Sequence, residues 1–507
     1  MLNAASWFVD RNVDEGRGAS PALHYEGRTL TYADVQELVD RTGNALLELG
    51  IRRPDRVVLL CHDAPEFVGA FWGSIKIGAV PVPVNTFLRP EEWLYCLDDS
   101  RAPALVISAP LVEAAAAVLG RAAHLRHVLV AGGPAGAHLS YEDRCARART
   151  DLVAAATSRD DPAFWLYSSG STGPPKAAIH LQHDMVVCSE TFARHVLDIR
   201  STDMVFSAAK LFFAYGLGNS GYFPASVGAL SVLHPQRMTP ALAFEVLTRR
   251  RPTLFFAGPA LYAGMLAFKD APPRDALASL RLCVSAGESL PADIFRRWKD
   301  RYGVEIMDGI GTTECLHMFI SNRPGAVKPG SSGQPVPGYE AAIVDERGTP
   351  VAVGEIGNLR IKGDSIMAGY WNQPEKTSAT LVGDWIETGD KYYEDPDGYF
   401  WYCGRSDDML KVKGAWVSPA EVESTLIQHP AVLQAAVVGH KDAEGLIKAK
   451  AFVVLKDPSL ATDALAAELM TFARENLAPY KCPRWVEFRT DLPMTATGKI
   501  QRFKLRA

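Results

Sequence analysis

The sequence has no long apolar run, no paired cysteines and no surplus of one charge. No uninterrupted apolar stretch reaches about 18 residues, the minimum length for a transmembrane helix. The first residues lack a basic segment followed by an apolar core, so they do not resemble a secretory signal. The eight cysteines stand apart, with no C-x-x-C pair, which disfavours a zinc ribbon, a redox dithiol and a disulfide framework. We expect a soluble cytoplasmic protein with no membrane partner.

The charge balance argues against a protein that binds nucleic acid through a basic surface. Lys and Arg total 53 and Asp and Glu total 58, a net charge of −5 with neutral histidines. No cationic excess is therefore present to neutralise phosphates. Hydrophobic residues make up 48% of the 507 residues and charged residues 22%, as in globular proteins and unlike disordered or coiled-coil chains.

Apolar runs of strand length alternate with helix-like segments through the first 300 residues or so. Residues 57–60 and 80–84 have the composition of strands, and the segment 64–76 between them has that of a helix. Because strand–helix–strand units form parallel sheets covered by helices, we predict an α/β fold whose large N-terminal domain has two parallel βαβ-type sheet lobes. After about residue 330, short strands separated by glycines predict an additional small, β-barrel-like lobe.

The last 100 residues or so have the pattern of a small mobile α+β domain. Ser418 and Pro419 are typical of a helix start, as N-cap and first helical residue. Strands at 435–438 and 449–455 and a helix over 463–477 are expected to follow. We place the domain boundary at a short hinge near Asp407, which gives domains of residues 1–407 and 408–507.

A loop rich in glycine and hydroxyl groups follows the predicted strand 164–166. Glycines allow backbone N–H groups to surround phosphate oxygens, hydroxyls add donors, and a lysine adds a positive charge. It is not a Walker A loop, because Pro175 and Ala177 stand where that motif has glycine and serine or threonine. The candidate phosphate-binding residues are Ser168, Ser169, Gly170, Ser171, Thr172, Gly173 and Lys176.

The loop SSGSTGPPK resembles the phosphate loop of the adenylate-forming superfamily, which includes acyl-CoA synthetases. Four further motifs of that superfamily follow in order: GIGTTE at 309–314, TGD at 388–390, GRSDD with KVKG over 404–414, and PMTATGK at 493–499. The resemblance covers essentially the whole chain. It implies ATP-dependent activation of a carboxylic acid to acyl-AMP, with release of pyrophosphate, and then transfer of the acyl group to coenzyme A.

The resemblance also implies roles for individual residues. Thr313 would donate to a phosphate, Glu314 would be a Mg²⁺ ligand, and Asp390 with Arg405 would bind the ribose. Lys499 would be the catalytic cation, Asp407 the hinge, and Lys413 with Gly414 would act in thioester formation. The adenine would lie against Ala286, Gly287, Glu288, Asp308, Gly309 and Ile310. Two positions depart from the superfamily: Ile310 replaces an aromatic residue, and Ala177 replaces a glycine that could adopt a positive φ.

The segment 206–219, together with 284–291 and 308–319, resembles benzoate-CoA ligases. This likeness implies benzoate or a substituted benzoate as the acid. The candidate acyl-pocket residues are Phe213, Ala214, Tyr215, Gly216 and His317. A small alanine beside a tyrosine is compatible with a flat slot for one ring, with the tyrosine tip available to a substituent.

Alternatives remain at this point. Residues 216–221 match the dinucleotide fingerprint G-x-G-x-x-G, but the segment 231–244 contains no Asp or Glu to hold a ribose, which disfavours a dehydrogenase. The aryl group could be transferred to a carrier-protein thiol instead of coenzyme A, or the chain could bind acids without catalysis. A homodimer is compatible with the resemblance.

Overall fold

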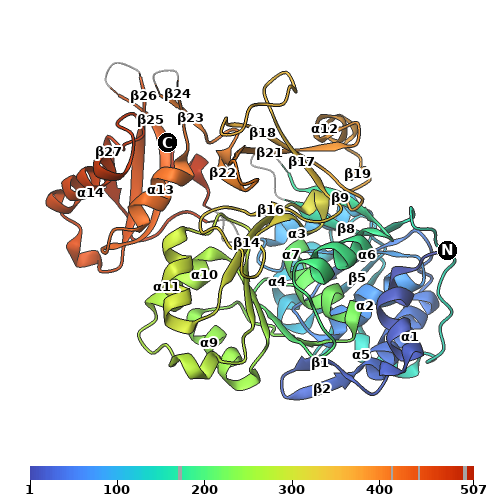
Figure 1. The fold of residues 1–507 in the computed structure, drawn as a ribbon. Coiled ribbons are helices and arrows are strands. Elements are labelled where there is room, and N and C mark those ends of the chain that lie inside the picture. The colour runs from blue at the N-terminus through green and yellow to red at the C-terminus, as the bar shows by residue number, and fades with distance from the viewer. Residues whose placement is uncertain (169–173, 413–414, 443–445, 495–499, 507) are drawn as a thin grey trace.

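A computed structural model gives the fold and describes residues 1–168, 174–412, 415–442, 446–494 and 500–506 (Figure 1). A large N-terminal part carries three sheet-containing lobes, and a smaller C-terminal part, orange to red in Figure 1, lies beside them. The α/β architecture predicted from the sequence is therefore confirmed. Among the described residues, no helix combines the length and apolar character needed to cross a membrane.

The first lobe is an entirely parallel five-stranded sheet. Its strands are buried on both faces and read as continuous apolar runs, as parallel sheets covered by helices do. In sheet order the strands are β4 (Val80–Pro83), β3 (Arg56–Leu60), β5 (Ala104–Ser108), β6 (His127–Ala131) and β7 (Leu139–Ser140). The helices of this region are α2 (Pro65–Lys76), α3 (Pro90–Ser100), α4 (Val112–Leu119) and α5 (Tyr141–Arg147).

The second lobe is a nine-stranded sheet with a parallel centre and antiparallel edges. In order its strands are β16 (Gln334–Pro335), β15 (Met318–Ser321), β14 (Ile306–Gly311), β13 (Leu282–Ser285), β12 (Leu254–Ala257), β10 (Met204–Ser207), β11 (Leu230–Val232), β1 (Pro21–Tyr25) and β2 (Arg28–Thr31). Successive residues of the central strands face two different cores. The helices are α6 (Asp184–Cys188), α7 (Ala214–Gly216), α8 (Phe223–Val227), α9 (Pro240–Arg250), α10 (Pro259–Ala267) and α11 (Ala292–Tyr302). The helix α1 (Tyr32–Glu48) contacts β1 and β2 of this sheet and packs mainly on α2 and α5 of the first lobe.

The third lobe is the small β-rich lobe that the glycine-separated strands predicted, and its strands pair antiparallel. It contains β17 (Glu340–Val344), β18 (Gly357–Lys362), β21 (Trp385–Glu394), β20 (Leu381–Val382) and β22 (Phe400–Arg405), with α12 (Pro374–Thr380) beside them. A separate three-stranded sheet joins this lobe to the phosphate loop. Its strands are β8 (Pro162–Ser168), β9 (Lys176–Leu181) and β19 (Gly369–Tyr370).

The C-terminal part has its own core, and its predicted elements are confirmed. Ser418 caps α13 (Pro419–Ile427), accepting a hydrogen bond from the Glu421 N–H at 3.1 Å. The helix α14 (Asp463–Asn476) covers a sheet of β25 (Val432–Lys441), β26 (Ile447–Leu455) and β27 (Trp485–Phe488). The hairpin β23 (Leu410–Val412) and β24 (Ala415–Val417) precedes α13. Contacts of α13 with β22 and α11 join this part to the rest.

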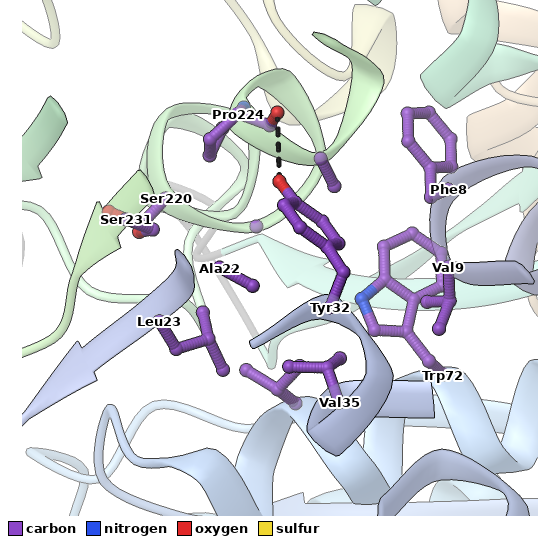
Figure 2. Close-up of a pocket in the computed structure, with 13 residues that line it drawn as sticks. Phe8, Val9, Ala22, Leu23, Tyr32, Val35, Trp72, Ser220, Pro224 and Ser231 are labelled. Carbon is purple, nitrogen blue, oxygen red and sulfur yellow. Dashed lines mark hydrogen bonds between the residues drawn. The ribbon is translucent and has the colours of Figure 1, made fainter. Parts of the chain in front are cut away.

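A small apolar cavity lies between the N-terminal segment, α1 and the segment preceding α8 (Figure 2). Phe8, Val35 and Trp72 line it, and the Tyr32 hydroxyl beside it donates to the Pro224 carbonyl at 3.3 Å. Its volume of about 20 Å³ holds about one water molecule. An aromatic acid does not fit there, so this cavity is not a substrate pocket.

Candidate active site

The predicted phosphate loop connects β8 and β9, two strands that pair antiparallel. Ser168 ends β8 and pairs in register with Lys176, the first residue of β9. The five loop residues predicted between them, Ser169, Gly170, Ser171, Thr172 and Gly173, lie outside the described residues. Ala177 is buried within β9 and is not among the residues with positive φ, so the alanine causes no backbone strain here.

A polar cluster lies at the base of this loop. The Glu314 carboxylate accepts hydrogen bonds at Oε1 from the Tyr370 hydroxyl at 2.7 Å and from the Ser168 hydroxyl at 3.3 Å. The Lys176 ammonium donates to the Tyr370 oxygen at 3.1 Å and lies 4.3 Å from the centre of that ring. Burial lowers the pKa of Lys176, and the nearby Glu314 opposes this effect. A cation and a carboxylate are therefore held together where nucleotide phosphates and a metal ion would meet.

Buried contacts position the segment that carries Thr313 and Glu314. His180 is fully buried on β9; its Nδ1 lies 2.7 Å from Asp184 Oδ2, and its Nε2 donates to the Thr313 carbonyl at 2.8 Å. The Thr312 hydroxyl accepts from the Cys315 N–H at 3.1 Å and caps the following turn. The motif is thus fixed to the strand that leaves the phosphate loop.

The predicted adenine residues lie at the carboxyl ends of β13 and β14, where Ser285 and Asp308 pair in register. Asp308 is 3% exposed. Its Oδ2 accepts from the Leu290 N–H at 3.1 Å, whereas its buried Oδ1 has no hydrogen-bond partner among the described residues. Burial raises the pKa of this carboxyl to about 7. An unpartnered acceptor at this position is compatible with the adenine amine, and the contact itself stays a prediction.

Backbone geometry supports the same adenine surface. Gly287 has φ +96° and is exposed beside the buried Ala286. A Cβ at Gly309 would lie 2.7 Å from the Ile320 carbonyl oxygen, so only glycine fits between these strands. Ile310, paired with Ile320, is half-buried and offers a flat apolar contact instead of a stacked ring.

The two predicted ribose residues pair across β21 and β22. Arg405 Nη1 donates to Asp390 Oδ1 and to the Thr388 carbonyl, both at 3.0 Å. Asp390 is 5% exposed, and its N–H donates to the Thr388 hydroxyl at 3.1 Å. Gly389, which lies between Thr388 and Asp390 in the sequence, has φ +73°, and a Cβ at this position would lie 2.8 Å from Arg405 Nη2. Arg405 thus orients the carboxylate as well as offering donors of its own.

The predicted acyl-pocket residues gather around an aromatic cluster. His317 is 3% exposed, and its ring centre lies 4.5 Å from that of Phe223 and 5.6 Å from that of Tyr215. Burial lowers the pKa of His317 to about 3, which keeps the ring neutral. The Tyr215 hydroxyl donates to the Val284 carbonyl at 3.2 Å. The phenol proton is used within the protein, and the phenol oxygen can still accept a hydrogen bond, so contact of the tip with a ring substituent stays a prediction.

The G-x-G-x-x-G match has a packing explanation. Residues 216–221 span the last residue of α7 and the helical segment that follows it, and do not lie between a strand and a helix N-terminus. A Cβ at Gly216 would lie 2.1 Å from the Lys210 carbonyl oxygen, and one at Gly218 would lie 2.4 Å from His317 Cδ2. These glycines allow close packing beside the half-buried Phe213 and Ala214 of the predicted pocket. No dinucleotide site is indicated.

The C-terminal part contacts this site next to the predicted catalytic lysine. Lys499 lies outside the described residues, as do Lys413 and Gly414. The N–H of Ile500, the next residue, donates to Glu288 Oε1 at 3.1 Å. Asp407 lies in the turn after β22, and its carbonyl accepts from Arg506 Nη2 at 2.9 Å. The chain end that follows Lys499 thus contacts both the adenine loop and the predicted hinge.

Glu314 is the candidate metal ligand, and its surroundings fit a magnesium ion bound with a nucleotide. Across the described part of the chain, no group of three or more His, Cys, Asp or Glu side chains could hold a metal ion. Mg²⁺ takes few protein carboxylates and completes its shell with phosphate oxygens and water. A single carboxylate beside a phosphate loop meets that requirement.

Sequence reasoning missed Tyr370, His180 and Asn219. Tyr370 comes from β19, in the sheet with β8 and β9, 56 residues after Glu314. The Asn219 side-chain oxygen lies 3.2 Å from His317 Nε2. Each residue contacts a motif that is distant in sequence, so no local pattern pointed to it.

Comparison with known proteins places these observations in a family. The family model described as AMP-binding enzyme matches residues 9–371, and the one described as AMP-binding enzyme C-terminal domain matches residues 421–499. The chain is 50% identical to a benzoate–CoA ligase of Thauera aromatica, over 100% of this chain and 96% of that protein.

Two solved structures are similar over nearly their full lengths. A benzoate CoA ligase from Burkholderia xenovorans has a TM-score of 0.94 and 45% identity, covering 100% of both chains. An anthranilate CoA ligase in complex with anthranoyl-AMP has a TM-score of 0.96 and 45% identity, covering 99% of this chain and 96% of that one.

Proposed function

The chain belongs to the AMP-binding enzyme family, and from this premise we propose that it is an AMP-forming ligase that joins an aromatic carboxylic acid to coenzyme A. The acid is benzoate or a substituted benzoate. Support for the aromatic acid comes from the relatives described above and from the aromatic surroundings of His317 and Tyr215.

The observation that carries the proposal is the full-length similarity to ligases of aromatic acids and coenzyme A. In the structure, the Ile500 N–H donates to Glu288 Oε1 at 3.1 Å. This contact joins the C-terminal lysine motif to the loop beside the proposed adenine site. It favours an arrangement in which Lys499 acts on a nucleotide bound by the N-terminal part.

In the first half-reaction, a carboxylate oxygen of the acid attacks the α-phosphorus of ATP and pyrophosphate leaves. Both reactants are anionic, so a fixed ammonium that contacts both lowers their repulsion and aligns them. We assign that role to Lys499. Asp390 with Arg405 holds the ribose, Asp308 accepts from the adenine amine, and Lys176 with the phosphate loop binds the phosphates.

A magnesium ion held by Glu314 belongs to the proposal for the same step. The ion would neutralise phosphate charge when bound. Ser168 and Tyr370 orient the carboxylate for it through the hydrogen bonds to Oε1. Thr313 lies next to Glu314, and the contact of its carbonyl with His180 holds it at the end of β14.

In the second half-reaction, the thiol of coenzyme A attacks the carbonyl carbon of the aryl-AMP and AMP leaves. We propose that the C-terminal part, residues 408–507, rotates about Asp407 between the two steps. Rotation would withdraw Lys499 and bring Lys413 and Gly414 to the site. Hinge motions that use a few residues at an element end are common in enzymes with lids.

The test is a panel of aromatic acids assayed for pyrophosphate release with ATP. We expect release that depends on benzoate or a substituted benzoate, and an aryl-CoA product by mass spectrometry when coenzyme A is added. The same assay without acid, and with NAD in place of ATP, provides the controls. Absence of acid-dependent pyrophosphate release across the panel would contradict the proposal.

Transfer to a carrier-protein thiol uses the same first half-reaction, so the acceptor must be tested separately. The relatives described above are named as CoA ligases, which favours coenzyme A. Mass detection of the thioester with each acceptor distinguishes them. Product on a carrier protein without product on coenzyme A would reverse this assignment.

A further inference from the structure

The short segment around β19 joins two motifs that are far apart in the sequence. Tyr370 pairs in register with Ala178 of β9, and the Trp371 N–H donates to the Ala177 carbonyl at 2.9 Å. Three residues before Tyr370, the Met367 N–H donates to the Glu314 carbonyl at 2.8 Å. Residues 367–371 therefore fix the strand that follows the phosphate loop to the segment that carries Glu314.

The Tyr370 hydroxyl lies between the two charged groups of the polar cluster. It accepts from Lys176 Nζ at 3.1 Å and lies 2.7 Å from Glu314 Oε1. An ammonium can only donate and a phenol has one proton, so the phenol donates that proton to the carboxylate. The Ser168 hydroxyl donates to the same oxygen, Oε1, at 3.3 Å. Both contacts therefore fall on one oxygen of Glu314, and neither involves Oε2.

We propose that Tyr370 is a positioning residue that presents Glu314 Oε2 to the magnesium ion of bound MgATP; this inference rests on the proposed function. The phenol also links Lys176 to the carboxylate, so that the ammonium remains beside the phosphate loop. Partners that hold a ligating carboxylate typically change metal affinity or activity about 10- to 100-fold when removed.

The test compares two tyrosine-to-phenylalanine variants of the full-length enzyme. Tyr370→Phe keeps the ring against Lys176 and removes only the hydroxyl that contacts Glu314. Tyr167→Phe is the matched control, because Tyr167 is on β8 next to Ser168 and its hydroxyl donates to Asp99 Oδ2 at 2.6 Å. Mn²⁺ affinity is measured by electron paramagnetic resonance with a non-hydrolysable ATP analogue. The Mg²⁺ activation constant for pyrophosphate release is measured separately.

We expect Tyr370→Phe to weaken Mn²⁺ binding and raise the Mg²⁺ activation constant roughly tenfold, with the KM of the aryl acid unchanged. Tyr167→Phe should leave both metal constants at wild-type values. Unchanged metal constants in Tyr370→Phe, or equal losses in both variants, would overturn the inference. If Tyr370→Phe also lowers Tm, the Mn²⁺ titration is repeated at a temperature where both variants are fully folded, and unchanged Mn²⁺ affinity there would still overturn the inference.

If the proposed function is wrong, the results differ from those expected if only the role of Tyr370 is wrong. Wild-type enzyme would then show no acid-dependent pyrophosphate release, whereas the Mn²⁺ titrations would still compare the two variants. Normal aryl-CoA synthesis with identical metal constants in both variants would overturn only the role of Tyr370.

Discussion

The N-terminal part holds its site residues by buried contacts, whereas the C-terminal part contacts the site through more accessible groups. Asp308, His317 and Asp390 are 3%, 3% and 5% exposed. On the other side, the Ile500 N–H donates to the half-buried Glu288 at 3.1 Å. Buried polar contacts are costly to break, and accessible ones open readily. This difference is what the proposed rotation of the C-terminal part requires: site residues held in place in the N-terminal part and a contact that can be broken on the other side.

The two parts also differ in net charge, and an ion pair fixes the chain end within the C-terminal part. Residues 1–407 carry a net charge of −8 and residues 408–507 carry +3. Within the C-terminal part, Arg502 Nη2 lies 2.8 Å from Glu423 Oε2, a pair only 16% and 10% exposed. This ion pair ties the segment after Lys499 to α13. The lysine motif is therefore expected to move with the C-terminal part and not independently of it.

The largest expected effect separates the two half-reactions. Lys499→Ala should slow aryl-AMP formation roughly 10²- to 10³-fold, because it removes a cation that stabilises developing charge. Thioester formation from supplied aryl-AMP should remain near the wild-type rate. Both rates are measured by single-turnover quench-flow. Lys504→Ala, at an exposed lysine five residues later, is the control, and equal loss of both half-reactions in Lys499→Ala would contradict the comparison.

The second-largest expected effect tests the proposed ribose site of the N-terminal part. Asp390→Asn should raise the KM for ATP about 10- to 100-fold, because hydrogen bonds to a charged acceptor contribute about 1.5–3 kcal/mol. The KM for the aryl acid should change little. Steady-state pyrophosphate release measures both constants. Asp384→Asn, whose side chain is 79% exposed on the same lobe, provides the control; equal changes in the two variants would remove Asp390 from the ribose site.

The third prediction concerns pH. The pKa of Asp308 is raised to about 7 by burial, so its ionised, accepting form becomes populated as pH rises through 7. We expect kcat/KM for ATP to increase over that range in wild type, and Asp308→Asn to lose this step in the profile. A wild-type profile identical to that of Asp308→Asn would contradict the adenine role.

The same group gives a stability prediction with a defined sign. The folded-state pKa lies above the ordinary aspartate value of about 4, so the folded protein retains a proton that the unfolded chain releases. This carboxyl therefore lowers stability progressively between about pH 4 and pH 7. Asp308→Asn should raise Tm more at pH 8 than at pH 4.5, as measured by thermal unfolding. An equal change in Tm at pH 8 and pH 4.5 would contradict the raised pKa of Asp308.

The smallest expected effect concerns the contact between the two parts. Glu288→Ala removes the acceptor for the Ile500 N–H and should slow aryl-AMP formation about two- to tenfold, since a hydrogen bond contributes about 0.5–1.5 kcal/mol net. Thioester formation from supplied aryl-AMP should be unaffected, because the proposed rotation breaks this contact. Glu375→Ala, at an exposed position on α12, serves as the control. Loss in the second half-reaction alone would contradict the assigned arrangement.

The sequence predicted local features well, for physical reasons. The helix start at Ser418 and Pro419 depends on neighbouring residues only, and α13 begins there. The parallel sheets follow from alternating apolar runs. Resemblance supplied the motifs, and the structure brings the described ones, Glu314, Lys176 and Ser168, to one place.

Contacts between distant segments could not be predicted in the same way. Tyr370 lies 194 residues from Lys176, and nothing near either residue specifies their pairing. The Tyr215 hydroxyl donates to the Val284 carbonyl of a separate strand, β13, and no local pattern specifies this contact. Ala177 raised a concern about positive φ that the β8–β9 pairing removes.

The most direct test of the account follows oxygen from the acid to the nucleotide. Benzoate labelled with oxygen-18 in its carboxylate is incubated with ATP, coenzyme A and wild-type enzyme, and the products are analysed by mass spectrometry. Attack on the α-phosphorus followed by thiol attack on the carbonyl carbon predicts one labelled oxygen in each AMP and none in pyrophosphate. Aryl-CoA formed with unlabelled AMP would contradict an aryl-AMP intermediate and the division of roles between the two parts.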